Sequence, residues 1–153
     1  MAETLGSLCD KLTIVKLKQW HSEDPSRLES LSQQEKQLVS EIDELVRSAL
    51  GGQISPQKLV FPANKVYKDT GQQMHEVAGN IGQMFARLAG VNCALWHEQE
   101  KVYDFENVPV PEKDKVVRQL ASLNLERNRC IDGIDREFRA IVESALPNSS
   151  RKN

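Results

Sequence analysis

The residues best suited to chemistry in this sequence are two Trp-His pairs, each followed by an acidic residue three positions past the histidine. They are Trp20-His21 with Asp24, and Trp96-His97 with Glu100. Residues at i and i+3 share one face of a helix, so each carboxylate could orient the neighbouring imidazole or share a metal ion with it. The other interpretation is structural: a hydrogen-bonded histidine beside a tryptophan that caps the core, present twice because a helical hairpin was duplicated.

A second group of polar residues lies further along the chain, in a segment whose pattern predicts a half-buried helix. Its members are Asn124, Arg127, Asn128 and Asp132. Asparagine is a poor helix former, so two of them in the middle of a helix require a reason. A buried polar network that fixes the register of the helices is one such reason. Binding of an anionic ligand through Arg127, or through the nearby Arg87, is the other.

Two pairs of carboxylates offer a third kind of chemistry. Glu41-x-x-Glu44 and Asp132-x-x-Asp135 resemble in spacing the acidic pairs with which all-helical nucleotide pyrophosphohydrolases bind Mg²⁺, an ion that prefers oxygen ligands. The two pairs fall one residue out of step in the repeat described below, and such spacings are common on surface helices. The sequence contains no nucleophile elbow, phosphate-binding loop or dinucleotide fingerprint. We therefore predict no catalytic residue, resident metal or cofactor.

The elements that position these residues are predicted to be helices. Apolar residues recur at i, i+3 and i+4 through most of the chain, whereas strand signals are confined to a short run at 59–61. Asp24-Pro25 predicts a helix start, because Asp is a favoured N-cap and Pro is favoured at the first helical position. The predicted division of the single domain 1–153 is helices at 3–22, 26–50, 72–103 and 112–146, a connection at 51–70 and a polar tail at 147–153.

The chain repeats itself, and the repeat indicates how the helices pair. Aligning the two Trp-His pairs also places Val15 on Val91. In the helix that follows, aligning Asp43 with Asp135 brings two Ile-Asp dipeptides and two arginines into register. The two copies are the helical hairpins 3–50 and 72–146. Two hairpins with one apolar stripe each bury those stripes most simply as an all-α, antiparallel four-helix bundle with an internal pseudo-twofold axis.

In an up-down-up-down bundle the first and third helices are parallel and lie diagonally, so the two histidines belong to the same end. Asp43 and Asp135 then lie about 21 Å from those histidines, at a rise of about 1.5 Å per residue, and cannot complete a metal site with them. Their predicted partners are bases near the other end, Lys11 for Asp43 and Arg87 for Asp135.

Three stretches resemble an uncharacterised bacterial family of small all-helical domains of unknown function: LCDKLTIVKLKQWHSED, VNCALWHEQEK and LASLNLERNRCIDGID. Members of that family carry a Trp-His-Leu-Glu-Asp type motif, followed one helix later by an Asn-x-x-Arg-Asn-x-x-Ile-x-x-Ile-Asp type motif. The resemblance covers both hairpins but not the 51–70 connection, and it implies a helical fold without an established activity. The first copy departs from the pattern, with Ser32, Glu35 and Lys36 where the second has Asn124, Arg127 and Asn128. This departure favours the second hairpin as the owner of any polar site.

Composition and charge argue against several classes of protein. The formal net charge is −2, which gives no reason to expect the concentrated basic surface that nucleic acid requires. No apolar run approaches the roughly 20 residues that cross a bilayer, and the first residues lack the basic and apolar regions of a secretory signal. The three cysteines are scattered and form no CxxC motif, as is typical of small core residues in a reducing compartment. We expect a cytoplasmic protein that binds neither nucleic acid nor membrane.

The function that these observations favour is a non-catalytic interaction or assembly module, which binds a protein partner or a second copy of itself. The connection 51–70 is the predicted partner-facing segment. Its exposed apolar residues are expected to be Leu59, Val60, Phe61 and Tyr67. The alternative is a protein that binds a small ligand or a metal ion at the Trp-His end and through the face 124–132.

Overall fold

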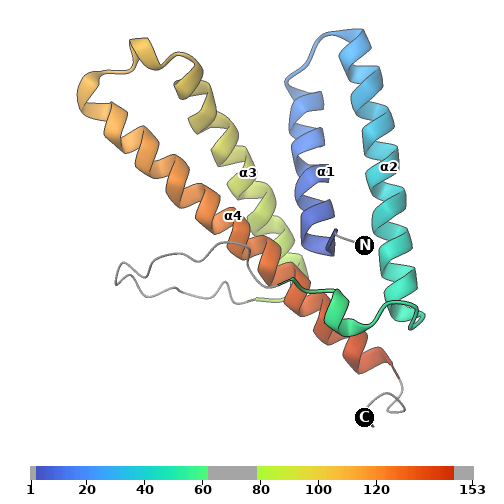
Figure 1. The fold of residues 1–153 in the computed structure, drawn as a ribbon. Helices are drawn as coiled ribbons and strands as arrows, with labels where there is room; N and C mark the ends of the chain where they lie inside the picture. The colour runs from blue at the N-terminus through green and yellow to red at the C-terminus, as the bar shows by residue number, and fades with distance from the viewer. Residues whose placement is uncertain (1–2, 62–78, 147–153) are drawn as a thin grey trace, which may run out of the picture.

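The computed structural model describes residues 3–61 and 79–146, and in these ranges every regular element is helical (Figure 1). The elements are α1 (Leu5–Trp20), α2 (Pro25–Leu50), η1 (Pro56–Lys58), α3 (Ile81–Tyr103), η2 (Phe105–Asn107) and α4 (Val110–Ala145). The four long helices pack against one another, which confirms the all-α four-helix bundle. Within the described ranges, none of the helices has the length and apolar character needed to span a bilayer.

The helix starts follow from side chains that satisfy the first backbone N–H groups. Thr4 Oγ1 accepts from the Ser7 N–H at 3.2 Å, and the carboxylate of Asp24 accepts from the Ser26 N–H at 3.2 Å. The predicted start at Asp24-Pro25 is thus confirmed, since Pro25 occupies the first helical position of α2. Helices α1 and α4 differ from their predicted bounds by only one or two residues at each end.

Helix α3 begins later than the sequence pattern indicates. Asn80 and Gln83 form a capping box, in which each side chain accepts from the other residue's backbone N–H at 2.9 and 3.0 Å. Gly79 before it has a φ of 153°, a conformation that side-chain-bearing residues rarely adopt. The prediction of a continuous helix through residues 79–80 is therefore wrong, and residues 72–78 lie outside the described ranges.

The two hairpins meet at one end of the molecule and diverge toward the other (Figure 1). We call the diverging ends the tips, formed by residues 20–25 in the first hairpin and 103–110 in the second. Helix α1 contacts α2, α3 and α4, whereas α2 contacts α4 far less than it contacts α1. Helices α1 and α3 are therefore neighbours, and both run from the meeting end toward the tips (Figure 1). The prediction that they lie diagonally is wrong.

The reason is the composition of the first two turns of α1, which are buried almost all round. Leu5, Gly6, Leu8, Cys9 and Asp10 are all buried, although the sequence pattern had suggested a single inner stripe. A helix segment that is buried on every side takes a central position rather than a corner of a bundle. The pseudo-twofold relation between the hairpins is consequently incomplete, because residues 81–86 of α3, which align with 5–10 of α1, include exposed positions.

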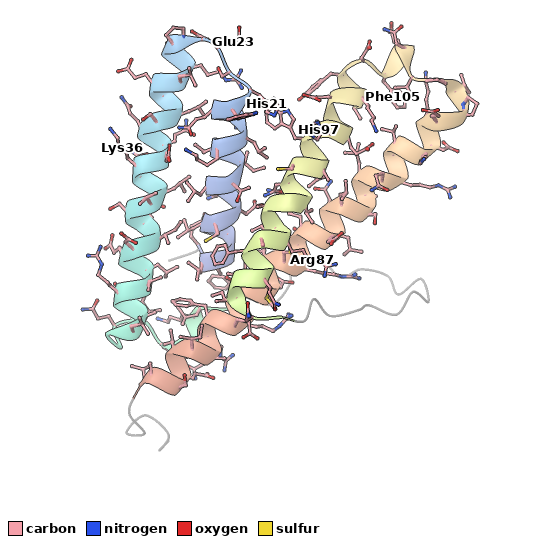
Figure 2. The ribbon with its side chains drawn as sticks, turned by 180° about the vertical axis from the view of Figure 1, so that it is seen from behind. His21, Glu23, Lys36, Arg87, His97 and Phe105 are labelled. Atoms are coloured by element: carbon pink, nitrogen blue, oxygen red, sulfur yellow. The ribbon has the colours of Figure 1, made fainter. Side chains whose placement is uncertain are left out.

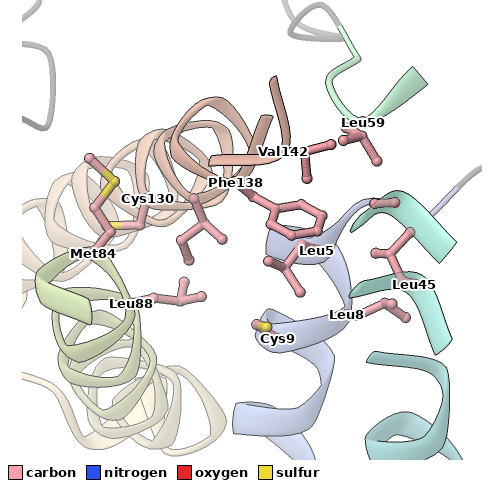
Figure 3. Close-up of a cluster of buried hydrophobic side chains, with 12 residues drawn as sticks. Leu5, Leu8, Cys9, Leu45, Leu59, Met84, Leu88, Cys130, Phe138 and Val142 are labelled. Carbon is pink, nitrogen blue, oxygen red and sulfur yellow. The ribbon is translucent and has the colours of Figure 1, made fainter. Parts of the chain in front are cut away.

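The core lies where the hairpins meet, and all four helices contribute to it (Figure 3). Its buried residues are Leu5, Leu8, Cys9, Leu45, Ala49, Leu59, Met84, Leu88, Cys130, Ile134, Phe138 and Val142. Cys9 and Cys130 are free thiols in this core, as the sequence predicted, whereas Cys93 is exposed. Burial raises the pKa of the Cys9 thiol to about 12, so this cysteine acts as a small apolar side chain.

Leu59 shows that the connection after α2 is part of the core. Its side chain is 2% exposed, and η1 before it contacts α4. Val60 is half-buried and Phe61 is exposed, while Tyr67 lies outside the described residues. The prediction that Leu59 faces a partner is therefore wrong, because this leucine closes the core where the two hairpins converge (Figure 3).

Gly6 allows the close crossing of α1 and α4. A Cβ atom at this position would collide with the Ile131 carbonyl oxygen and would lie 3.0 Å from Asp135 Oδ1. Helix backbones approach this closely only where one of them carries no side chain. In α3, by contrast, a Cβ at Gly90 would meet nothing within 4 Å.

Candidate functional site

The Trp-His end joins the two hairpins through one aromatic contact. The imidazole of His21 stacks on the indole of Trp96, with ring centroids 4.7 Å apart and planes inclined by 12°. On α3, Trp96 Nε1 donates to Glu100 Oε1 at 3.0 Å, and His97 Nδ1 lies 3.5 Å from Glu100 Oε2. His21 and His97 therefore sit at the same end, as the topology argument predicted (Figure 2).

The two Trp-His pairs are not equivalent. Trp96 is half-buried under His21, whereas Trp20 is 86% exposed at the end of α1. Asp24, the acidic residue of the first pair, caps α2 and does not orient His21. The interpretation of Trp20 as a tryptophan that caps the core is therefore wrong. Stacking across the hairpins gives Trp96 a partner, whereas no ring contact of Trp20 occurs within residues 3–61 and 79–146.

A cavity of about 870 Å³ opens beside the second pair, between α3 and α4 at the tip of the second hairpin. His97, Glu100, Lys101 and Asp104 line it from α3 and the turn, and Glu112 lines it from α4. Its volume is in the range of small-molecule sites, and its walls carry both signs of charge. It brings together His97 and Glu100, two residues that the sequence singled out.

The four polar residues of the face 124–132 differ in burial and in the contacts that they make. Asn124 is exposed, and its amide donates to the Leu120 carbonyl at 3.0 Å on the same helix. Asn128 and Asp132 are half-buried, and burial raises the pKa of the Asp132 carboxyl. Arg127 reaches another helix, where it binds Asp10 of α1. The face is thus not a single site.

Asp10 is the centre of a buried polar network that the sequence analysis missed. Arg127 Nε donates to Asp10 Oδ1 at 2.7 Å, and Arg127 Nη2 donates to Asp10 Oδ2. Asn92 of α3 donates to the same Oδ1 at 2.9 Å, and its own Oδ1 finds no partner among the described residues. Asp10 also holds the guanidinium in its charged form, which raises the pKa of Arg127. The network connects three helices and joins the two hairpins.

The aligned positions of the first hairpin explain why Arg127 turns outward from its own hairpin. Glu35 stands where the second copy has Arg127, and Lys16 stands where it has Asn92. Lys16 Nζ binds Glu35 Oε1 at 2.9 Å, so in the first copy the side chains at these two positions pair with each other within one hairpin. In the second copy neither position is acidic, and both side chains bind Asp10 instead. The signal in the sequence was an acid, Asp10, directly after the apolar residues Leu8 and Cys9 in the first two turns of α1.

Asp135 lies at the other contact between the hairpins. Its Oδ1 accepts from the Gly6 N–H at 2.7 Å, and its carboxylate is also hydrogen-bonded by the Thr4 side chain. It thereby satisfies one of the unpaired N–H groups at the start of α1. Burial nevertheless dominates and raises the pKa of Asp135 to about 6.

The predicted partners of the two Ile-Asp acids are wrong. Arg87 Nε binds Glu126 Oε1 at 2.7 Å. The hydrogen-bond partner of Asp135 is instead the Gly6 N–H at the N-terminus of α1. In the first hairpin Lys11 binds Glu3 at 2.7 Å. Asp43 lies 3.8 Å from Arg47 on its own helix. The central position of α1 brings its N-terminus, rather than a basic side chain, to Asp135.

The carboxylate pairs suggested for Mg²⁺ are placed on different helices with different surroundings. Glu41 and Glu44 are exposed on α2, whereas Asp135 is buried against α1. Over residues 3–61 and 79–146, no three His, Cys, Asp or Glu side chains are grouped so that they could hold a metal ion.

A comparison of the sequence with protein-family models finds no match, and comparisons with curated proteins and with solved structures likewise find none. What the structure itself establishes is an all-helical protein of four packed helices.

Proposed function

We propose that this protein is a non-catalytic interaction or assembly module whose hairpin tips bind a protein partner or a second copy of the chain. The observation that carries the proposal is the exposure of large apolar side chains at both tips. Trp20 is 86% exposed, Tyr103 85% and Val110 79%. Trp20 ends α1, Tyr103 ends α3 and Val110 begins α4, so they gather where the hairpins turn (Figure 1).

Energetics supports this assignment of the tips. Exposed tryptophan or tyrosine leaves much apolar surface in water, and these residue types dominate the binding energy of protein interfaces. Both tips belong to the same end of the molecule, because α1 and α3 run parallel. One partner could therefore contact both, while the His21–Trp96 stack holds α1 and α3 in place. We also propose that the protein is cytoplasmic and related to the helical family that it resembles, on the evidence of its unpaired cysteines and its motifs.

Sedimentation equilibrium and native mass spectrometry of the full chain test the proposal. We expect a dimer or higher species, or a protein complex recovered from cells, that the double substitution Trp20→Ser and Tyr103→Ser weakens at least about tenfold. Leu50→Ser is the matched control, since Leu50 is an exposed apolar residue at the far end of α2. A monomer with no complex that depends on the tips would contradict the proposal.

A second candidate function, binding of a small ligand, rests on the cavity between α3 and α4 beside His97 and Glu100. Native mass spectrometry also tests it, because a retained ligand adds mass. Loss of that mass on His97→Ala, with the fold unchanged by circular dichroism, would support the ligand site. A clean apo mass would favour the interaction module.

A further inference from the structure

The stack of His21 on Trp96 is one half of a reciprocal pair of contacts. The repeat aligns Trp20 with Trp96 and His21 with His97, so the reciprocal contact would stack His97 of the second hairpin on Trp20 of the first. Within the described residues this contact is not made, and Trp20 is 86% exposed while the side chain of His97 is 67% exposed. The chain therefore exposes both members of an aromatic pair whose equivalent it already uses between its own hairpins.

His97 lies on the wall of the cavity of about 870 Å³ between α3 and α4, which we call the α3–α4 cavity. The lining also includes Val108, Pro109 and Val116, of which Val116 is buried. These three residues give an aromatic ring an apolar wall beside the imidazole. The volume leaves room for a tryptophan side chain, so an indole could enter the cavity and stack on His97.

The cavity also supplies the acceptor that a buried indole N–H requires. In the contact already present, Trp96 Nε1 donates to Glu100 Oε1 at 3.0 Å. Glu100, Asp104 and Glu112 all line the cavity. Asp104 accepts from the amide of Asn107, a neutral donor that leaves the carboxylate its charge and further lone pairs. A tryptophan in the cavity thus finds both apolar contact and a carboxylate acceptor.

We propose that this protein forms a twofold dimer in which Trp20 of each copy enters the α3–α4 cavity of the other and stacks on His97 there. This inference rests on the proposed function as an assembly module, and it names the partner as a second copy of the chain. The contact in the dimer repeats the His21–Trp96 stack with the roles of the two hairpins exchanged.

The arrangement of the hairpins allows both contacts to form at once. Trp20 belongs to the tip of the first hairpin and the cavity to the tip of the second, and both tips lie at the same end of the molecule (Figure 1). A twofold axis along the length of the molecule places the first hairpin of each copy beside the second hairpin of the other, at the same height. Such an interface is closed, because each copy gives one tryptophan and receives one.

The area involved favours a reversible dimer. A buried tryptophan removes about 150–250 Å² from water, and it covers a similar area of the wall that it contacts. Two such contacts together bury about 600–1,000 Å², which approaches the roughly 1,200 Å² of a small specific interface. We therefore expect association that is lost on dilution. A second copy is the partner that this argument selects, because one chain carries both the exposed indole and the cavity that matches it.

The experiment is a complementation test by sedimentation equilibrium of the full chain. Every contact needs Trp20 of one copy and His97 of the other, so Trp20→Ala and His97→Ala each remove both contacts from a homodimer. We expect either substitution to weaken dimerisation at least about tenfold. An equal mixture of the two variants regains one contact, which joins Trp20 of the His97→Ala copy to the cavity of the Trp20→Ala copy. The mixture should therefore associate more tightly than either variant alone.

Native mass spectrometry with one variant labelled with ¹⁵N identifies the mixed dimer by its mass. Leu50→Ala is the control for the loss of an exposed apolar side chain, because Leu50 lies at the far end of α2. Lys36→Ala is the control for the loss of an exposed polar side chain on α2 (Figure 2). Neither control should change dimerisation. Trp20→Ser and His97→Gln replace the two test variants if either loses its helical circular dichroism signal.

The outcomes separate this inference from the proposed function. A chain that stays monomeric at every concentration, a His97→Ala variant that dimerises like wild type, or a mixture that gains nothing would each overturn the dimer. A complex with a different protein that still depends on Trp20 and Tyr103 would leave the interaction module standing without it. Loss of both the dimer and any complex that depends on the tips would remove the proposed function as well.

Discussion

Asp10 of α1 binds Arg127 of α4 through two parallel hydrogen bonds, and this pair ties the first hairpin to the second across 117 residues of sequence. Asn92 of α3 donates to the same carboxylate, so three helices depend on one acidic side chain. Bidentate pairs of this kind fix the relative orientation of the groups that carry them. The crossing of the two hairpins is thus set by a polar contact as well as by the apolar core.

Removing Arg127 should destabilise the fold strongly. Arg127→Met leaves the buried carboxylate of Asp10 without its counter-ion, which typically costs about 3–5 kcal/mol. Adding Asp10→Leu to this variant should recover much of the loss, because no uncompensated charge remains. Urea unfolding of the single and double variants measures this coupling. Lys16→Met is the control, since its exposed pair with Glu35 is worth at most about 1 kcal/mol. If the losses in free energy of unfolding caused by Arg127→Met and Asp10→Leu simply added in the double variant, the coupling between Asp10 and Arg127 would be contradicted.

Asp135 should make the protein more stable as the pH falls toward 4. Its pKa in the folded state, about 6, is above the usual value of 3.8, so folding favours the protonated carboxyl. Its stabilising contribution is complete below pH 3.8 and is lost as the pH rises through 6. Asp135→Asn keeps an oxygen for the Gly6 N–H but cannot titrate.

Denaturant midpoints between pH 4 and pH 7 test this. The stability difference between wild type and Asp135→Asn should change by on the order of 2 kcal/mol across that range. Asp43→Asn, at the aligned and exposed position of α2, should show no comparable change. If the free energies of unfolding of wild type and Asp135→Asn changed in parallel with pH, burial would not be raising the pKa of the Asp135 carboxyl.

Two Gly→Ala substitutions should have opposite effects. At Gly6 the new methyl collides with the Ile131 carbonyl, and overpacking of this kind costs about 1–3 kcal/mol. At Gly90 the methyl meets nothing within 4 Å in the middle of α3, so it should stabilise by up to about 1 kcal/mol. Thermal unfolding followed by circular dichroism gives both values. A tolerated alanine at Gly6 would show that α1 and α4 can separate.

Loss of the His21 ring should weaken the contact between α1 and α3. His21→Ala removes a stacked aromatic pair worth about 0.5–1.5 kcal/mol and exposes Trp96 to water. Fluorescence reports this directly in a Trp20→Phe background, where Trp96 is the remaining tryptophan. A shift of its emission to longer wavelength is expected in His21→Ala. His97→Ala, which removes no stacking partner, should leave the emission nearly unchanged.

Local signals in the sequence determined the helices and several of their ends. Asp24 and Pro25 start α2 because a side-chain oxygen and a fixed φ satisfy the first turn, and these effects need no distant residue. The repeat of the Trp-His pair likewise placed His21 and His97 at one end. Both inferences depend only on neighbours within a helical turn or on the order of the helices along the chain.

Tertiary structure alone decided which surfaces meet. The sequence showed Arg127 as an unusual polar residue, but its partner Asp10 depends on how α1 is rotated and how closely it crosses α4. Gly6 permits that crossing, and Leu59 closes the core behind it. The sequence could not reveal these contacts, because periodicity gives one apolar face per helix and not its partner. The choice among possible partners is made by packing, where volume, charge and backbone clearance must be satisfied together.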